Sequence, residues 1–251
     1  MAVITGGTGV LGMEFAKVLA EHGANTVLAD VDATKCSQCA EEILKASGKR
    51  SLGVRTDVSN QEDVASLMRS AEETFGRIDI LINNAAAQPP GFCTAFEEYP
   101  LDLWNRVMAV NLTAQFLTTR AVAPIMLRQN RGSVINIAST YGVVGPNQHI
   151  YEGTNFNTPA IYSTSKAGVL GLTRYLATYW AEKGIRVNSV TPGGVFRGHT
   201  DPFLKNYCQR VPMGRMAKQD ELRGAIVYLA SDASSYVTGH NLVVDGGWTV
   251  W

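Results

Sequence analysis

Thr5-Gly6-Gly7-Thr8-Gly9-Val10-Leu11-Gly12 is the stretch of sequence that decides the fold of this chain. The apolar run at residues 2–4 before it is typical of a buried strand, and the pattern at residues 13–22 after it is typical of a helix. Gly7, Gly9 and Gly12 have the G-x-G-x-x-G spacing, which permits a tight turn, close approach of a pyrophosphate and close packing of helix on strand. Because the helix amino end then faces the phosphates, the stretch predicts dinucleotide binding rather than an ordinary strand-to-helix turn.

Asp30 follows the next apolar segment, residues 25–29, roughly twenty residues beyond the glycines. A carboxylate at that place accepts hydrogen bonds from the adenosine ribose hydroxyls and repels the 2′-phosphate of NADP. Asp30 therefore predicts a preference for NAD, which Lys35 alone among the nearby cations would weaken. The alternative is structural: Asp30 caps the helix that begins near Ala33.

Strand-like apolar runs alternate with helical patterns along the whole chain. Further strands are predicted at residues 51–55, 78–82, 133–138, 187–190 and 241–244, and helices at residues 33–46, 60–75, 103–130, 160–183 and 220–231. This alternation predicts a single α/β domain over residues 1–251, a doubly wound, Rossmann-type parallel sheet with helices on both faces. A ligand crevice is expected at the carboxyl ends of the strands, where residues 6–12, Asp30, Asn84 and Ser139 fall.

The composition is that of an ordinary globular protein, with 251 residues of which 45% are hydrophobic and 18% charged. The 22 basic and 22 acidic residues cancel, which argues against nucleic acid or acidic lipid as a partner. We therefore expect small molecules or copies of the same chain as partners. No apolar run approaches the roughly 20 residues that span a bilayer and no targeting segment is recognised, so we expect a cytoplasmic protein without membrane association.

Cys36 and Cys39 have the C-x-x-C spacing of zinc and redox sites. No second cysteine pair accompanies them, and the four histidines form no cluster with ligand spacing. Both cysteines lie in the helix predicted at residues 33–46. Half-buried helix thiols are therefore the favoured interpretation, and no metal site is predicted.

Tyr162 and Lys166, in the segment Tyr162-Ser163-Thr164-Ser165-Lys166, are four positions apart and meet on one face of the helix predicted at residues 160–183. A phenol has a pKa of about 10, and a nearby cation favours the phenolate and lowers that pKa. The pair therefore predicts a tyrosine that exchanges a proton near neutral pH. Because the same spacing also occurs on solvated helix surfaces, the surrounding motifs decide between the two interpretations.

Together these motifs resemble the short-chain dehydrogenase/reductase family over essentially the whole chain. The glycine loop is followed in order by Asp57-Val58, Asn83-Asn84-Ala85-Ala86, Asn111, Ser139, Tyr162, Lys166 and Pro192-Gly193. The resemblance implies that Asn111, Ser139, Tyr162 and Lys166 are the catalytic tetrad. It also implies that the cofactor lies against Gly6, Thr8, Gly9, Leu11, Gly12, Asp30, Asp57, Val58, Asn84, Ala85, Ala86, Tyr162, Lys166, Pro192, Gly193 and Val195.

The chain departs from the pattern of this family at two positions. The usual loop is T-G-x-x-x-G-x-G, but here Val10 replaces the middle glycine and Gly9 precedes it, which leaves the path of the loop open. A longer, sugar-nucleotide-modifying branch uses T-G-x-x-G-x-x-G, which the loop satisfies, but the chain is too short for the additional substrate domain of that branch. Arg197 replaces the threonine that commonly follows the Pro-Gly segment, so contacts to the carboxamide and pyrophosphate there are open as well.

The resemblance implies that a secondary alcohol and a ketone are interconverted by hydride transfer with NAD(P). Tyr162 is expected to be the general acid/base, and Lys166 to lower its pKa and bind the nicotinamide ribose. Ser139 is expected to bind the substrate oxygen, and Asn111 to hold a water that connects Lys166 to solvent. The structural alternatives are a turn cap for Ser139, a helix kink for Asn111 and a surface position for Lys166. A dinucleotide-binding regulator without catalysis is the rival function, and the intact tetrad argues against it.

The segment at residues 145–159, between Ser139 and Tyr162, is unusually long and rich in hydrogen-bonding groups. Such a site selects hydroxylated substrates, because each buried polar group left unpaired costs about 1–3 kcal/mol. The segment also resembles that of short-chain enzymes of bacterial surface-sugar and flagellin-glycan pathways. We therefore expect a sugar or polyol derivative bound by Ser139, Gln148, Tyr151 and Glu152. A solvated excursion of the chain, with a 3-oxoacyl thioester or a simple ketone as substrate, is the alternative.

Residues 196–216 contain a short helical patch between glycines and prolines, which predicts a lid over cofactor and substrate; a stiff surface excursion is the alternative. The helix predicted at residues 160–183 carries more apolar surface than one sheet face needs. This surplus predicts a homodimer or homotetramer, which members of the family form through this helix and the one after Asn111.

Overall fold

A seven-stranded, all-parallel sheet forms the centre of the protein, and the computed structural model describes every residue from 1 to 251. The strands are β1 (Ala2–Thr5), β2 (Thr26–Asp30), β3 (Ser51–Arg55), β4 (Ile80–Asn83), β5 (Gly132–Ile137), β6 (Ile185–Pro192) and β7 (Asn241–Val244). Their order is β3-β2-β1-β4-β5-β6-β7, so the winding reverses between β1 and β4. The predicted doubly wound, Rossmann-type sheet is confirmed.

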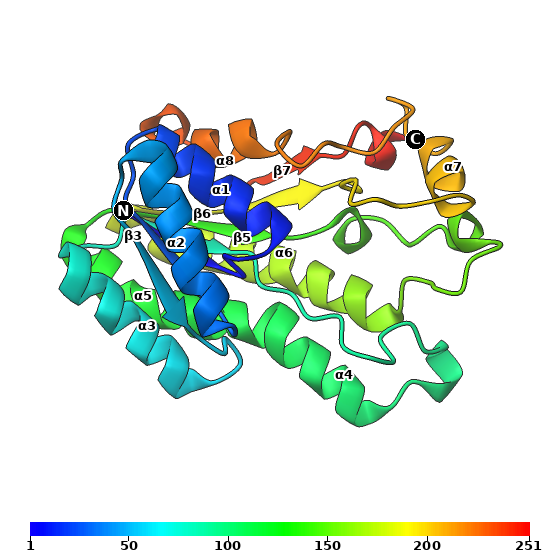
Figure 1. Cartoon of the computed structure of the whole chain (residues 1–251), viewed down its shortest axis with the longest axis horizontal. Coiled ribbons are helices and arrows are strands. Elements are labelled where there is room, and N and C mark those ends of the chain that lie inside the picture. The colour runs from blue at the N-terminus through cyan, green and yellow to red at the C-terminus, as the bar shows by residue number, and fades with distance from the viewer.

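Helices cover both faces of this sheet (Figure 1). They are α1 (Val10–Glu21), α2 (Ala33–Ser47), α3 (Gln61–Phe75), α4 (Leu101–Met108), α5 (Ala114–Gln129), α6 (Ala160–Trp180), α7 (Phe203–Cys208) and α8 (Arg223–Ala230). On one face α1 packs beside α2 and α8, and on the other α3 packs beside α5 and α4 beside α6. A membrane-crossing helix is absent, since none combines the necessary length and apolarity.

The hydrophobic core has two halves, one on each face of the sheet. Phe15 of α1 packs with Ile4 and Leu28 in one half, and Leu67 of α3 packs with Met126 in the other. Neighbouring residues of a strand point to opposite faces, so β1 and β4 are buried on both sides and are mostly apolar, with Thr5 and Asn83 at their carboxyl ends. Full burial of each large aliphatic side chain stabilises the fold by about 1.5–3 kcal/mol.

A buried polar network interrupts the apolar core near the carboxyl ends of β4 and β5. The Asn83 side chain donates to Thr119 Oγ1 at 3.0 Å and to Asn136 Oδ1 at 2.9 Å, and it accepts from Thr118 Oγ1 at 2.7 Å. The Asn136 side chain donates in turn to Thr173 Oγ1 at 2.9 Å. Because its members pair with one another, the network ties two central strands to α5 and α6 without leaving these amides unsatisfied.

The helix predicted at residues 103–130 is present but is not a regular α-helix throughout. The chain instead forms α4, a π-helical segment at Ala109–Thr113 and then α5. A π-helical turn holds one more residue than an α-helical turn and is frequent at functional sites. Side-chain periodicity does not reveal such an insertion, because the apolar pattern continues on both sides of it.

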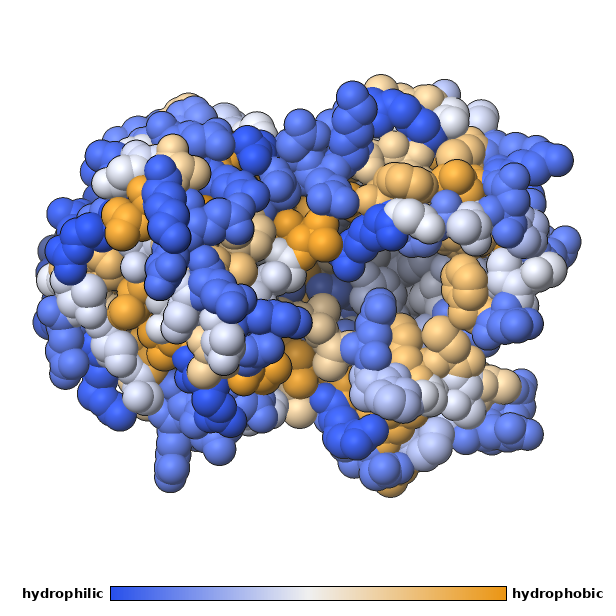
Figure 2. Space-filling model, viewed as in Figure 1, coloured by the Kyte–Doolittle hydropathy of each residue, from blue (hydrophilic) through white to orange (hydrophobic).

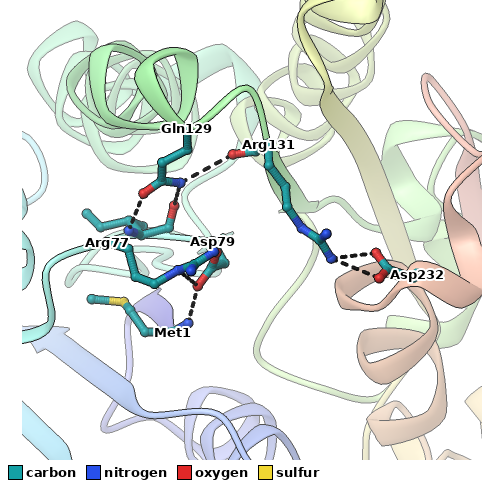
Figure 3. Close-up of polar contacts among 7 residues, drawn as sticks. Met1, Arg77, Asp79, Gln129, Arg131 and Asp232 are labelled. Carbon is teal, nitrogen blue, oxygen red and sulfur yellow. Dashed lines mark hydrogen bonds and ion pairs between the residues drawn. The ribbon is translucent and has the colours of Figure 1, made fainter.

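Several ion pairs lie around the amino ends of the strands, at the end of the sheet opposite the expected ligand crevice (Figure 3). Asp79 pairs with Arg77 and contacts the Met1 amino group, and Arg131 pairs with Asp232 at 2.7 Å. A cavity of about 760 Å³ lies at this edge, and its third arginine, Arg186, donates to the carbonyl oxygens of residues 229, 231 and 237. Since these charged groups have partners within the protein, we assign them a structural role.

Cys36 and Cys39 both lie in α2, as predicted. Burial raises the pKa of the Cys36 thiol to about 11, and its Sγ contacts the carbonyl oxygens of Asp30 and Val54. A thiol in this environment stays protonated at neutral pH and packs as a small apolar side chain.

The close packing of the glycine loop against α1 can be tested by adding a methyl group at Gly12. A Cβ at Gly12 would lie 2.1 Å from the carbonyl oxygen of Gly6, whereas a Cβ at exposed Gly224 of α8 would meet nothing within 4 Å. We expect Gly12→Ala to lower the free energy of unfolding by about 1–3 kcal/mol, because backbone must move to admit the methyl group. Gly224→Ala is the control and should leave stability unchanged or slightly higher. Chemical denaturation measures both, and equal stabilities would contradict the packing described.

Candidate active site

A cavity of about 670 Å³ opens at the carboxyl ends of the strands. Its walls come from the ends of β4, β5 and β6, from the first turns of α6, from residues 145–159 (the substrate loop) and from residues 196–216 (the lid segment). Figure 2 shows a hollow between the main body of the molecule and the end that carries α7. The crevice predicted at this edge of the sheet is therefore present.

Tyr162, Ser139 and Lys166 lie on one wall of this cavity. Tyr162 and Lys166 are one turn apart in α6, and Ser139 follows β5. The Lys166 ammonium is buried, donates to the carbonyl oxygen of Ile137 at 2.8 Å and lies 5.9 Å from the centre of the Tyr162 ring. The Ser139 side chain lies close enough to the Tyr162 phenol to lower its pKa, and its hydroxyl accepts from the Tyr141 N–H at 3.3 Å. Lys166 is thus not a surface lysine, and Ser139 both caps a turn and faces the phenol.

Burial dominates the protonation of this pair. It raises the pKa of Tyr162, against which the Ser139 side chain and the charge of Arg197 act in the lowering direction. Burial also lowers the pKa of the Lys166 ammonium, to about 8. The expectation that the helix spacing by itself yields a tyrosine of lowered pKa is therefore wrong, because desolvation of the phenolate outweighs the charges that the protein supplies.

Asn111 lies in the π-helical segment and not in the cavity wall. Its Oδ1 accepts from the backbone N–H of Ala87 at 2.8 Å, and its carbonyl oxygen accepts from the Gln115 side chain at 3.3 Å. Its Nδ2 is fully buried and has no partner in the protein. Asn111 thus satisfies backbone beside the cavity, and one amide donor remains for a further group.

The glycine loop is held against the end of β4 by contacts that exclude side chains. Gly6 has a left-handed φ of 60°, and a Cβ there would lie 2.9 Å from the Cα of Ala85. The Asn84 side chain donates to the carbonyl oxygens of Thr5 and Gly6 at 3.1 and 3.0 Å. A Cβ at Gly9 would meet only one backbone atom, at 3.3 Å, so this glycine leaves open space beside the loop.

The path of the loop, left open by the departure at Val10, is settled by the start of α1. Val10 is the first residue of this helix, Gly9 precedes it, and no side chain caps the helix or places an acid in its first turn. The amino end of α1 therefore presents N–H groups and partial positive charge. The Leu11 side chain lies in the cavity wall. This cradle fits the pyrophosphate of a dinucleotide.

Asp30 ends β2 beside the glycine loop. Its Oδ2 accepts from the Thr8 hydroxyl at 2.7 Å and from the Thr8 N–H at 3.2 Å, and its Oδ1 accepts from the N–H of Val31. The structural alternative for Asp30 is wrong, because Asp32 caps α2 by accepting from the Lys35 N–H at 3.0 Å. Asp30 has no ion pair, and its carboxylate retains lone pairs for further donors.

The other predicted cofactor residues occupy two places. Pro192, Gly193, Val195 and Ala86 line the cavity near Tyr162. The Asp57-Val58 pair lies beyond β3, where Asp57 accepts from the N–H and hydroxyl of Ser59, and it does not line the cavity. The predicted cofactor residues thus extend from Asp30 and Asp57, beyond the ends of β2 and β3, to the cavity that Tyr162 lines.

Two of the four predicted substrate residues lie outside the cavity wall. Gln148 and Glu152 are exposed and do not line the cavity, whereas Ser139 and Tyr151 do. A short 3₁₀ helix at Gln148–Tyr151 directs Ile150 into an apolar cluster and Tyr151 into the cavity, which turns the neighbouring polar residues outward. The Tyr151 hydroxyl is already engaged by Tyr141 and Thr158.

Several cavity residues were not singled out from the sequence. Asn157 of the substrate loop lines the cavity, and its buried Oδ1 has no partner in the protein. Phe203 of the lid segment stacks on Tyr151, with ring centres 5.7 Å apart. Tyr207 accepts from the Gly194 N–H at 2.5 Å and stacks on Trp248 at 4.7 Å. Single aromatic residues in a loop carry no periodic signal, so only the structure identifies them.

The lid segment is packed rather than extended into solvent. Its buried residues Phe203, Tyr207, Val211 and Met216 form an apolar cluster with Ile150 and Trp248. Gly198 and Gly214 have left-handed φ values of 83° and 69° near its two ends, which are positions suited to hinges. Closure of this segment over a ligand stays a prediction.

The sequence and the fold are similar to those of known dehydrogenases and reductases. The sequence matches the family described as enoyl-(acyl carrier protein) reductase over residues 8–249. It is 36% identical to cis-4-hydroxycyclohexanecarboxylate dehydrogenase from Sinomonas cyclohexanicum, over 99% of this chain and 96% of that protein. A short-chain type dehydrogenase/reductase from Mycobacterium marinum is 34% identical, with a TM-score of 0.89 over 99% of this chain and 94% of that one. An NAD⁺-bound xylitol dehydrogenase is 32% identical, with a TM-score of 0.87 over 98% and 97% of the two chains.

The hydrogen bond from the Gly194 N–H to the Tyr207 hydroxyl holds the turn that follows β6. Its contribution to stability can be tested by removing the hydroxyl. Tyr207→Phe keeps the stacked ring but leaves a partly buried N–H without its acceptor. We expect the free energy of unfolding to fall by about 1–3 kcal/mol. Tyr228→Phe in α8, whose hydroxyl makes no contact of this kind, should be close to wild type. Thermal and chemical denaturation of the two variants measure the difference, and a wild-type value for Tyr207→Phe would contradict this role.

Proposed function

Because this chain belongs to the short-chain dehydrogenase/reductase family, we propose that it interconverts a secondary alcohol and a ketone with Tyr162 as the group that moves the proton. It is an oxidoreductase that acts on CH–OH groups with NAD(P). The observation that carries the proposed residue roles is the meeting of Tyr162, Ser139 and Lys166 on one cavity wall, beside a cradle that fits a dinucleotide.

The chemistry is divided between the cofactor and three side chains. Bound NAD(P) supplies the hydride acceptor for oxidation and the hydride donor for reduction. In oxidation the Tyr162 phenolate takes the proton of the substrate hydroxyl, and in reduction the Tyr162 phenol returns it. The Ser139 hydroxyl binds the substrate oxygen and stabilises the negative charge that develops there.

Lys166 and Asn111 act behind the tyrosine. Lys166 is anchored on the Ile137 carbonyl and keeps its charge beside the tyrosine ring at pH values below about 8. The unpartnered Asn111 Nδ2 supports a role in holding a water that passes protons between Lys166 and solvent. Because burial raises the pKa of Tyr162, formation of the phenolate needs a further positive charge, which oxidised nicotinamide would supply when bound.

We propose NAD as the preferred cofactor. Asp30 lies beside the glycine loop with no cation paired to it, and Lys35 pairs with Asp32 instead, at 3.9 Å. A 2′-phosphate at this end would meet an uncompensated carboxylate.

For the substrate we propose a hydroxylated compound, such as a sugar or polyol derivative. The buried, unpartnered Asn157 Oδ1 supports this, because it can accept from a second hydroxyl of the substrate. Similarity to a xylitol dehydrogenase is consistent with it. A 3-oxoacyl thioester is the second candidate, which the 33% identity to a 3-oxoacyl-[acyl-carrier-protein] reductase from Synechocystis supports.

We also propose a homodimer or homotetramer that forms through α5 and α6. Tyr175 and Tyr179 on α6 are 64% and 59% exposed and stack on one another, and Phe116 on α5 is 45% exposed. Exposed aromatic rings on two neighbouring helices are typical of an interface between subunits.

Replacement of the Tyr162 phenol tests the proposed proton transfer. Tyr162→Phe should bind NAD as the wild type does but lower the rate of alcohol oxidation by about 100-fold or more. In the wild type this rate should rise with pH until the phenolate has formed, since only the deprotonated phenol accepts the proton. Absorbance of reduced nicotinamide measures turnover over a panel of polyols, simple alcohols and 3-oxoacyl compounds. Tyr175→Phe in the same helix is the control, and equal rates for Tyr162→Phe and wild type would refute the role of Tyr162.

Cofactor choice can be tested by a matched pair of aspartates. Asp30→Ser removes the carboxylate beside the glycine loop and should shift the ratio of kcat/KM for NAD over NADP towards NADP by about tenfold or more. Asp32→Ser removes the same charge two residues away and keeps a side chain that can cap α2, so it should leave both the stability and the ratio close to those of the wild type. Steady-state kinetics with both cofactors measure the ratio. An unchanged ratio in Asp30→Ser would show that Asp30 does not select the cofactor.

A further inference from the structure

The cavity is lined by cations without matching anions. Its 26 lining residues include Lys166 and Arg197 and contain no aspartate or glutamate. The Lys166 ammonium is held by the Ile137 carbonyl, as described above. The Arg197 guanidinium has no ion pair and no hydrogen-bond acceptor in the protein, and only its backbone N–H is engaged, by His199 Nδ1 at 3.3 Å. Arg197 is exposed, so its charge at the cavity wall is met by solvent and not by an anionic side chain.

Two arginines near the lid segment are compensated, whereas Arg210 within it also has no ion pair but lies outside the cavity. Arg215, within the same segment, pairs with Glu221 at 2.6 Å, and Arg223, just after it, pairs with Glu14 at 2.6 Å. An arginine that lines a concave site and has no partner presents a planar set of donors to whatever enters. The natural acceptor for such a fork is a carboxylate or a phosphate, which binds it in a bidentate manner.

His199 does not add a second charge but does add a donor. Burial, followed by the charge of Arg197, lowers the pKa of His199 below its ordinary value of 6.5, so the ring is neutral at neutral pH. Because Nδ1 accepts from the Arg197 N–H, the proton of the neutral ring is on Nε2. His199 lines the same cavity and stacks near Phe203, with ring centres 5.4 Å apart.

We infer that the substrate carries an anionic oxygen group, a carboxylate or a phosphate, which pairs with the Arg197 guanidinium while the reacting alcohol lies at Tyr162. The inference rests on the proposed function, because it places the anion within the site of the same reaction. With Asn157 facing a second hydroxyl, the substrate class becomes a hydroxylated acid or a hydroxylated phosphate ester rather than a neutral polyol.

Arg197 lies at a different strand end from the pyrophosphate cradle. It follows β6 and lines the cavity that Tyr162 faces, whereas the cradle follows β1. Its charge acts in the lowering direction on the pKa of Tyr162 and on that of His199, which both line the cavity. The aromatic rings of Phe92, Tyr151 and Phe203 line the space between and suit the carbon body of a substrate.

A binding comparison tests this directly. Protein saturated with NADH is titrated by calorimetry with 4-hydroxycyclohexanecarboxylate, with its carboxamide and with cyclohexyl phosphate. NADH with an alcohol gives no turnover, so the titration reports binding alone. The carboxylate or the phosphate should bind at least about tenfold more tightly than the carboxamide, and the tighter of the two anions identifies the group. Raised salt should reduce this discrimination.

Variants at Arg197 attribute the discrimination to this side chain. Arg197→Gln should abolish the preference for an anion and Arg197→Lys should restore part of it, while Arg210→Gln, a control in the lid segment outside the cavity, should keep all of it. Arg197→Gln should also move the pH dependence of alcohol oxidation to higher pH, because a cation that favours the Tyr162 phenolate is removed.

Two results would overturn the inference. One is equal binding of the anions and the carboxamide by the wild type, including no measurable binding of any. The other is an anion preference that persists in Arg197→Gln while the affinity for NADH falls, which would assign Arg197 to the cofactor phosphates. Failure of the proposed function is distinguishable, because it appears as absent turnover or as unchanged turnover in Tyr162→Phe, whatever the carboxamide comparison gives.

Discussion

The hydrogen bond from the buried Lys166 ammonium to the Ile137 carbonyl is the contact on which the site depends, because it joins the first turns of α6 to the carboxyl end of β5. This contact places the Tyr162 phenol beside Ser139 and removes both ionisable groups from water. Burial disfavours the phenolate and the ammonium alike, so it raises one pKa and lowers the other. The pKa values of such a buried pair respond strongly to any further charge nearby. Two such charges are proposed: the positive nicotinamide and an anion that pairs with Arg197. The protonation of Tyr162 is thereby coupled to what the cavity holds.

The scaffold supports this arrangement by holding the carboxyl ends of the central strands rigidly. The Asn83 and Asn136 network fastens β4 and β5 to α5 and α6 just behind the cavity. Gly6 lies so close to Ala85 that the loop after β1 has little freedom to move away from β4. The substrate loop and the lid segment pack on one another in the cluster that contains Ile150, Phe203 and Trp248. The strand ends and α6 thus carry Ser139, Tyr162 and Lys166, and the proposed substrate contacts lie on loops.

The sequence was sufficient for the sheet, the glycine loop and the meeting of Ser139, Tyr162 and Lys166, because strand ends of a parallel sheet converge and α-helical spacing is regular. It was insufficient where local geometry departs from those regularities. The π-helical segment at Ala109–Thr113 leaves the apolar pattern intact, and the 3₁₀ helix at Gln148–Tyr151 turns polar residues outward that composition alone placed at the substrate. The direction of the Tyr162 pKa was missed for a further reason: spacing reveals the neighbouring cation, but the extent of burial is a property of the whole fold.

The central claim is that Tyr162 reaches its reactive, deprotonated form through charge brought into the cavity and not through the protein alone. The most direct test is an ultraviolet difference titration of the phenolate, wild type minus Tyr162→Phe, with and without saturating NAD⁺. We predict a pKa for Tyr162 above the ordinary value of about 10 in the protein alone and a clearly lower pKa with NAD⁺ bound. A pKa already below 10 in the protein alone, or one that NAD⁺ does not change, would contradict the account.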